Sequence, residues 1–168
     1  MVKEEKASTA EDVCIDQTDN KTMAGDIIRK RVYASVGAGF VPIPIFDLLA
    51  LSGIQIEMVA KLSTLYGVPF KKDIVKTAIS ALVGGILPVA AAPMIASFLK
   101  MIPVIGYTTS VVTLSAAGGA STYAIGKVFV QHFESGGTLL NFNADKVKEY
   151  YQEKFKEGEQ VASSAKAK

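Results

Sequence analysis

The side chains of this 168-residue chain that could act in catalysis or metal binding are few and lie far apart in the sequence. His132 is the only histidine and Cys14 the only cysteine, so neither an internal disulfide nor a His/Cys metal site can form. We predict a capping or surface role for His132 at a helix end. Gly37-Ala38-Gly39 lacks the third glycine and the Gly-Lys-Ser/Thr continuation of nucleotide-binding loops, and it therefore predicts a flexible break. We expect no enzymatic activity, no catalytic residue and no cofactor.

Gln55 is the polar residue with the most informative position. It falls between Leu51 and Met58 on an otherwise apolar helical stripe. A buried amide has to hydrogen-bond a partner or face a polar cavity. Two interpretations stay open: a core glutamine bonded inside the protein, which we favour, and a group that contacts a partner or lines a polar path.

Charge is distributed unevenly along the chain, although the net charge is only +2. That total is too small for a nucleic-acid-binding face. Arg29, Lys30 and Arg31 precede one long uncharged run, and Lys71, Lys72 and Lys76 precede the next. This order is typical of the cytoplasmic flanks of membrane segments, and a solvated helix face would give the same pattern.

Two long stretches, residues 77–99 and 101–126, carry no charged side chain and are separated by Lys100. As a helix, the first would span about 34 Å at roughly 1.5 Å per residue. The hydrocarbon core of a bilayer is about 30 Å thick. Each stretch is therefore long enough to cross a membrane, or to form the core of a water-soluble bundle.

The elements that must position these residues are helices. A four-residue apolar spacing predicts a first helix from about Thr22 to Gly37–Gly39. Its stripe consists of Ala24, Ile28, Val32 and Val36. Pro42-Ile43-Pro44 breaks this helix, and Asp47 starts a second one, which Gly67 and Pro69 end.

A hydrophobic hairpin should follow, over about residues 73–132. Its helices run from Lys71 to Leu99 and from Pro103 to His132, and they lie antiparallel. Gly136-Gly137 then opens a loop, and Asn143 caps a last amphipathic helix. We predict an all-α helical bundle that associates with a membrane. Residues 21–157 form its single domain, and residues 1–20 and 158–168 are disordered polar tails.

Small residues at four-residue spacing recur in the hairpin and should let its two helices approach closely. The glycines that we assign to this packing are Gly84, Gly85, Gly118, Gly119 and Gly126. The same faces could pair one copy of the chain with another.

The segment from Ala34 to Phe70 resembles domain-of-unknown-function family 697, a mostly bacterial family. The shared pattern is a small-residue run, a Pro-x-Pro break, an Asp that starts a helix, a Gln two turns later and a Tyr-Gly ending. Here these residues are Pro42, Pro44, Asp47, Gln55, Tyr66 and Gly67. In that family the domain stands alone or follows a P-loop GTPase domain. The resemblance implies a membrane protein, and because this chain has no Walker sequence, any GTPase would be a separate partner.

We therefore expect a membrane-associated anchor or adaptor that binds membrane lipid and no nucleic acid. Its expected location is the inner (cytoplasmic) membrane, with both termini in the cytoplasm and Lys100 at the distant turn. A soluble all-α scaffold that self-associates through its small-residue faces is the alternative. A pore or transporter subunit, lined by Gln55 and by Ser and Thr hydroxyls, is a lesser one.

Overall fold

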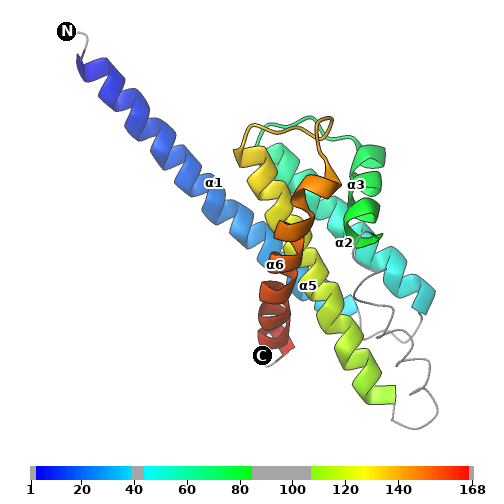
Figure 1. Ribbon diagram of the computed structural model, residues 1–168. Helices are drawn as coiled ribbons and strands as arrows, with labels where there is room; N and C mark the ends of the chain where they lie inside the picture. Colours follow the sequence, from blue (N-terminus) through cyan, green and yellow to red (C-terminus); the bar gives the residue numbers. More distant parts are fainter. Residues whose placement is uncertain (1–2, 39–43, 85–106, 167–168) are drawn as a thin grey trace.

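The computed structural model describes residues 3–38, 44–84 and 107–166, which form five helices and contain no strand (Figure 1). The helices are α1 (Lys3–Ala38), α2 (Pro44–Leu65), α3 (Lys72–Gly84), α5 (Tyr107–Glu134) and α6 (Ala144–Lys166). The predicted all-α fold is confirmed.

Contacts along α5 define how the helices are oriented. Leu51 of α2 contacts α5 at Gly118, and Tyr66, just after α2, bonds Glu134 at the end of α5, so α2 and α5 run in the same direction. Ile28 and Val36 of α1 face Gly126 and Gly119 of α5, in reverse order, so α1 runs antiparallel to α5.

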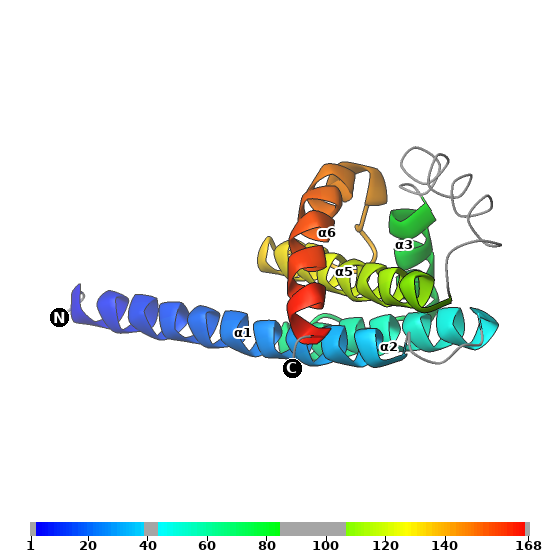
Figure 2. The same ribbon diagram turned by 90° about the horizontal axis from the view of Figure 1, so that it is seen from below.

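Helix α6 crosses α1, α2 and α5 at a steep angle, as Figure 2 shows. Tyr151 bonds Ser121 of α5, and Ala162, three turns further along α6, still faces Gly119. The first half of α1 projects away from the bundle, and the C-terminal end of the chain lies beside the bundle (Figures 1 and 2).

The predicted apolar stripe of α1 is confirmed, since all four of its residues are 5% exposed or less. The helix begins at Lys3, however, and not near Thr22. Residues 3–20 had been predicted to be a disordered tail. Lys, Glu and Ala are strong helix formers, and they extend α1 beyond the part that packs against other helices.

Helix α2 begins at Pro44, whose fixed φ and missing N–H suit the first turn of a helix. Asp47 lies in this first turn, as predicted. The helix ends where Gly67 adopts φ 65° and the Val68 N–H donates to Ser63 O at 2.8 Å. This turn is the Schellman motif. Gly136, with φ 77°, ends α5 in the same way.

The predicted hairpin differs from the structure in its packing. Helix α3 is described to Gly84, and the remainder of the predicted third helix, with Gly85, lies outside the described residues, as does Pro42. The glycines of α5 were expected to pack against the third helix, but they face α1, α2 and α6. A Cβ atom on Gly126 would lie 2.6 Å from Ile28, and one on Gly119 would lie 2.7 Å from Val36 and 2.9 Å from Ala162. A Cβ atom on Gly84 would meet no atom within 4 Å.

Asn143 caps α6 as predicted, because its Oδ1 accepts from the N–H groups of Asp145 and Lys146 at 3.0 and 3.2 Å. The helix continues to Lys166 and so passes through residues 158–166, which had been assigned to a disordered tail. Gly158 explains the difference. A Cβ atom there would lie 2.8 Å from Ala120 O, so the bare backbone of α6 packs directly on α5.

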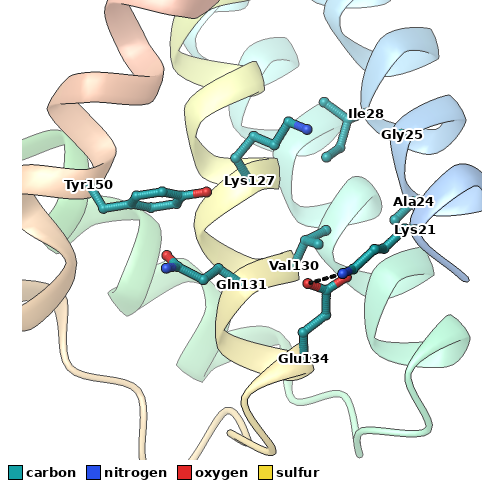
Figure 3. A pocket seen from close by; sticks show the side chains of 9 residues that line it. All are labelled: Lys21, Ala24, Gly25, Ile28, Lys127, Val130, Gln131, Glu134 and Tyr150. Carbon is teal, nitrogen blue, oxygen red and sulfur yellow. Dashed lines mark ion pairs between the residues drawn. The ribbon is translucent and has the colours of Figure 1, made fainter. Parts of the chain in front are cut away.

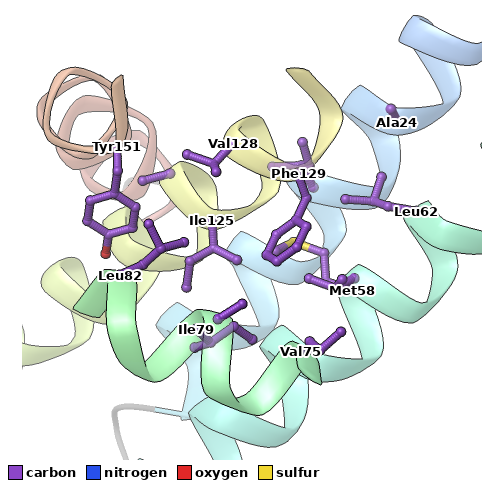
Figure 4. Close-up of a cluster of buried hydrophobic side chains, with 14 of the residues drawn as sticks. Ala24, Met58, Leu62, Val75, Ile79, Leu82, Ile125, Val128, Phe129 and Tyr151 are labelled. Atoms are coloured by element: carbon purple, nitrogen blue, oxygen red, sulfur yellow. The ribbon is translucent and has the colours of Figure 1, made fainter. Parts of the chain in front are cut away.

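The described helices share one apolar core (Figure 4). Its fully buried large side chains include Ile28, Met58, Leu62, Ile125, Phe129 and Tyr151. In the part of the chain that the structure describes, no helix is both long and apolar enough to be a candidate membrane span.

Candidate functional site

Gln55 lies at the centre of a buried polar network that joins four helices. Its Nε2 donates to Thr122 Oγ1 at 3.3 Å and to Ser121 Oγ at 3.4 Å, both on α5. Ser121 Oγ lies 3.0 Å from the Tyr151 hydroxyl of α6, and Thr122 Oγ1 lies 2.8 Å from Ser35 Oγ of α1. All five side chains are buried.

The hydroxyl groups of this network also bond the backbone. Thr122 Oγ1 is placed to donate to Gly118 O at 2.9 Å, and Ser35 Oγ to Arg31 O at 2.9 Å. The two backbone bonds and the Ser35–Thr122 bond are three bonds that need a hydroxyl proton. The two hydroxyl groups carry one proton each, so only two of the three bonds can form at once. The two amide bonds from Gln55 are long and therefore weak. The network is satisfied mainly by its short hydroxyl bonds.

Burial sets the protonation behaviour of Tyr151. Desolvation raises the pKa of its hydroxyl, and the bond with Ser121 lowers it by a smaller amount. No member of the network hydrogen-bonds a histidine or carboxylate among the described residues. The bonds of the network connect α1, α2, α5 and α6 through their buried side chains.

A second polar contact joins the ends of α2 and α5. The Tyr66 hydroxyl donates to Glu134 Oε1 at 3.0 Å, and Lys21 of α1 lies 4.0 Å from Glu134 Oε2. Burial and the neighbouring carboxylate both raise the pKa of Tyr66. The negative charge of Glu134 is therefore shared between a phenol and an ammonium group.

A cluster of tyrosines and lysines lies where α6 crosses α5. The Tyr123 hydroxyl donates to Glu157 at 2.7 Å, and Lys154 bonds the same carboxylate at 2.8 Å. These bonds lower the pKa of Glu157, while burial, followed by the bond to Glu157, raises the pKa of Tyr123 to about 12. Lys127 lies over the Tyr123 ring at 5.5 Å, and Lys154 lies over the Tyr150 ring at 5.4 Å.

A pocket of about 270 Å³ opens between α1, α5 and α6 (Figure 3). Ala24, Ile28 and Val130 give it apolar walls, and Gly25 leaves one wall without a side chain. Polar groups surround the opening: Lys21, Lys127, Gln131, Glu134 and Tyr150. Within the described residues there is no cluster of side chains suited to holding a metal ion.

His132 joins the end of α5 to the loop that follows. Its Nε2 lies 2.9 Å from Thr138 O and 3.1 Å from Asn141 Oδ1. Asn141 Oδ1 also accepts from the Thr138 N–H at 2.8 Å. These contacts hold the loop against the end of α5, and they differ from the predicted cap because they go to loop residues and not to carbonyl groups of the helix.

A family model described as Domain of unknown function (DUF697) matches residues 4–160, nearly the whole chain. The chain belongs to this family. It is also similar to Magnetosome membrane protein 22 of Magnetospirillum gryphiswaldense, with 39% identity over 154 residues that cover 91% of this chain and 79% of that protein. No solved structure matches the chain.

The structure separates the DUF697 motif residues into several roles. Gln55 lies in the buried network, Tyr66 bonds Glu134, and Gly67 supplies the left-handed turn after α2. Pro44 and Asp47 lie in the first turn of α2. The described motif residues therefore lie in α2 or in the turn that follows it, and they have separate roles.

Sequence reasoning missed the partners of Gln55 in the DUF697 chain. Ser35, Ser121 and Thr122 resemble the many other small polar residues of their helices, so nothing in the local sequence marks them as buried. Tyr151 lies in the predicted last helix, where nothing in the local sequence indicates that its hydroxyl bonds Ser121. The glycines nearby were the available signal, since Gly118 and Gly119 place Ser121 and Thr122 on a closely packed helix.

Proposed function

We propose that this chain is a non-enzymatic, membrane-associated helical protein that anchors or recruits a partner. The observation that carries the proposal is the similarity, over nearly the whole chain, to a protein named as a magnetosome membrane protein. The family resemblance implies a separate P-loop GTPase as the partner.

The distribution of charge supports a membrane-facing end of the bundle. Residues 32–56 contain one charged side chain, Asp47, and residues 77–126 contain one, Lys100. The described parts of these ranges are the end of α1, the start of α2, the end of α3 and the first two-thirds of α5. These helix ends lie together at the end of the bundle opposite the projecting N-terminus (Figures 1 and 2).

Ion pairs lie at the border between this charge-poor end and the rest of the bundle, which we call the charged half. Arg31 of α1 bonds Glu57 of α2, and Lys61 lies 3.7 Å from the same carboxylate. Arg29 and Lys30 are exposed beside them. This excess of basic groups at the border is what the positive-inside rule expects of a cytoplasmic face. We place the charged half, α6 included, in the cytoplasm.

Alkaline carbonate extraction of membranes from cells that express the chain at its native level tests the membrane part of this proposal. We expect the protein to stay in the membrane pellet. Recovery of monodisperse protein from the aqueous fraction without detergent would contradict membrane association and favour the soluble scaffold.

Cross-linking in intact membranes, followed by purification in detergent and mass spectrometry, tests the partner. We expect a GTPase whose recovery changes with the added guanine nucleotide. Recovery of cross-linked copies of this chain alone would instead favour self-association.

A further inference from the structure

The pocket between α1, α5 and α6 has a composition that neither membrane anchoring nor core packing explains. Ala24, Ile28 and Val130 give it apolar walls, whereas its opening carries two ammonium groups, one carboxylate, an amide and a phenol. Among the described residues, no hydrogen bond engages the side chains of Lys127, Gln131 or Tyr150. Two of them make cation-π contacts instead, since Lys127 lies over the Tyr123 ring and Lys154 lies over the Tyr150 ring. In Figure 3 the Lys127 amine extends across the opening towards Ile28, and the Tyr150 hydroxyl points towards α5.

Gly25 gives a second reason to regard this pocket as a binding site. A glycine inside a helix costs about 1 kcal/mol relative to alanine. Gly119, Gly126 and Gly158 have a packing reason for this cost, because a Cβ atom would strike a neighbour. A Cβ atom on Gly25 would meet no described atom within 4 Å, as is also true of Gly53 in α2, which lines no described pocket. The effect of Gly25 is to keep the wall of the pocket open.

The charges around the opening favour an anion. Lys21 and Glu134 lie at one end, where the carboxylate is shared between Lys21 and the Tyr66 hydroxyl. Lys127 lies over the Tyr123 ring and has no carboxylate within salt-bridge distance among the described residues, although its charge helps to lower the pKa of Glu157 from further away. The groups on α5 and α6 that make no hydrogen bond among the described residues are therefore one cation and two neutral hydrogen-bonding groups. Lys127 and Gln131 lie on α5 and Tyr150 lies on α6, and such a set of donors suits a tetrahedral anion with several acceptor oxygens.

We propose that this pocket binds the phosphate group of a small phosphate ester. Lys127 supplies the charge, the Tyr150 hydroxyl and the Gln131 amide donate hydrogen bonds, and the organic part of the ligand lies against Ala24, Gly25 and Ile28. The volume is just below the usual range for ligand pockets, so the ligand is small. The same chemistry occurs in a free metabolite and in a phospholipid headgroup. This site goes beyond the proposed membrane function and does not depend on it.

Binding of sn-glycerol 3-phosphate to the purified full-length chain in detergent micelles, measured by isothermal titration calorimetry, tests the site with a free ester. Flotation with phosphatidylcholine vesicles, with and without phosphatidic acid, tests a lipid source. We expect Lys127→Gln and Gly25→Leu each to weaken binding in the responding assay by at least about tenfold, the value of one charge-assisted hydrogen bond.

Two matched variants control for net charge and for helix propensity. Lys76→Gln removes an exposed cation of α3, and Gly53→Leu replaces an exposed glycine of α2 that also has open space around it. Both should bind like the original chain. Equal losses in Lys127→Gln and Lys76→Gln, or no response to either probe, would overturn the proposal. Carbonate extraction of the same variants is a separate readout, so failure of this site is distinguishable from failure of membrane association.

Discussion

The Gln55 amide is deeply buried, but its hydrogen bonds are long. The amide is 3% exposed, yet its two bonds to α5 are 3.3 and 3.4 Å long and each acceptor has another partner. Removing the amide therefore leaves no buried hydroxyl without a bond. We therefore expect the packing of this side chain between α2 and α5 to contribute more to stability than its hydrogen bonds do.

We predict that Gln55→Leu changes the free energy of unfolding by no more than about 1 kcal/mol, because Ser121 and Thr122 keep their bonds to Tyr151 and Ser35. Gln55→Ala should destabilise by about 2–5 kcal/mol, because it opens a cavity in the core. Chemical denaturation of both variants gives the comparison. A large loss in Gln55→Leu, similar to that in Gln55→Ala, would show that the amide bonds matter more than the packing. Folded, membrane-bound Gln55→Leu protein that fails to recruit its partner would assign the amide to partner binding.

Tyr123 predicts a dependence of stability on alkaline pH. Its pKa of about 12 in the folded chain exceeds the usual value of about 10. As pH rises between these values, the unfolded chain loses the proton first, so the stabilising contribution present below about pH 10 is lost. We expect Tyr123→Phe to flatten this decline and to remove the phenolate absorbance step near pH 12.

Glu157→Gln is the matched test of the cause. Removing the carboxylate that accepts from Tyr123 takes away the hydrogen bond and the charge that raise the pKa of the phenol besides burial and the smaller effect of Tyr150, so the absorbance step should move to lower pH. An unchanged titration in this variant would mean that Glu157 does not contact Tyr123 in solution.

Among the helices, local pattern predicted the elements better than their pairing. The stripe of α1, the turn at Gly67 and the Asn143 cap each depend on residues close in sequence, and all are present in the structure. Helix α1 begins earlier and α6 ends later than expected. Their polar ends are good helix formers, and the contact of Gly158 with α5 is not visible in the sequence.

The glycine faces show why pairing was harder to predict. Small residues at four-residue spacing indicate that a helix packs closely, but not which helix lies against it. Gly118 and Gly119 appear equivalent in the sequence. In the structure a Cβ atom on Gly118 would lie 3.6 Å from the end of the Leu51 side chain, whereas one on Gly119 would lie 2.7 Å from Val36 and 2.9 Å from Ala162.

We therefore predict opposite effects for alanine at these two neighbouring positions. Gly119→Ala should destabilise by about 1–3 kcal/mol, because Ala162 can yield only if α6 moves away. Gly118→Ala should be neutral or stabilise by about 0.5–1 kcal/mol, because it lowers the entropy of the unfolded chain without a clash. Thermal or urea unfolding distinguishes them. Equal effects would mean that α6 is not packed on α5 at this point.

At the scale of the molecule, the arrangement of the helices gathers the charge-poor parts of the sequence at one end of the bundle and the charged parts at the other. Each end of the charge-poor ranges 32–56 and 77–126 is bordered by a charged residue, and these four residues lie on four different helices: Arg31, Glu57, Lys76 and Lys127. The contacts between Arg31 and Glu57, and between Ile28 and Gly126, place at least three of these borders at neighbouring positions. Membrane association then requires the charge-poor end to face lipid.

Two exposed hydroxyl residues of α2, Ser52 and Thr64, test this orientation directly, because they lie about 18 Å apart along one helix. Ser52 belongs to the charge-poor end and Thr64 to the charged end. In a Cys14→Ser background, we expect a membrane-impermeant maleimide to label Thr64→Cys in inside-out membrane vesicles and to leave Ser52→Cys largely unlabelled. Both should react fully after denaturation. Equal labelling of the two positions in intact vesicles would mean that lipid does not cover the charge-poor end, and the bundle would then have to sit on the membrane by another face or remain in solution.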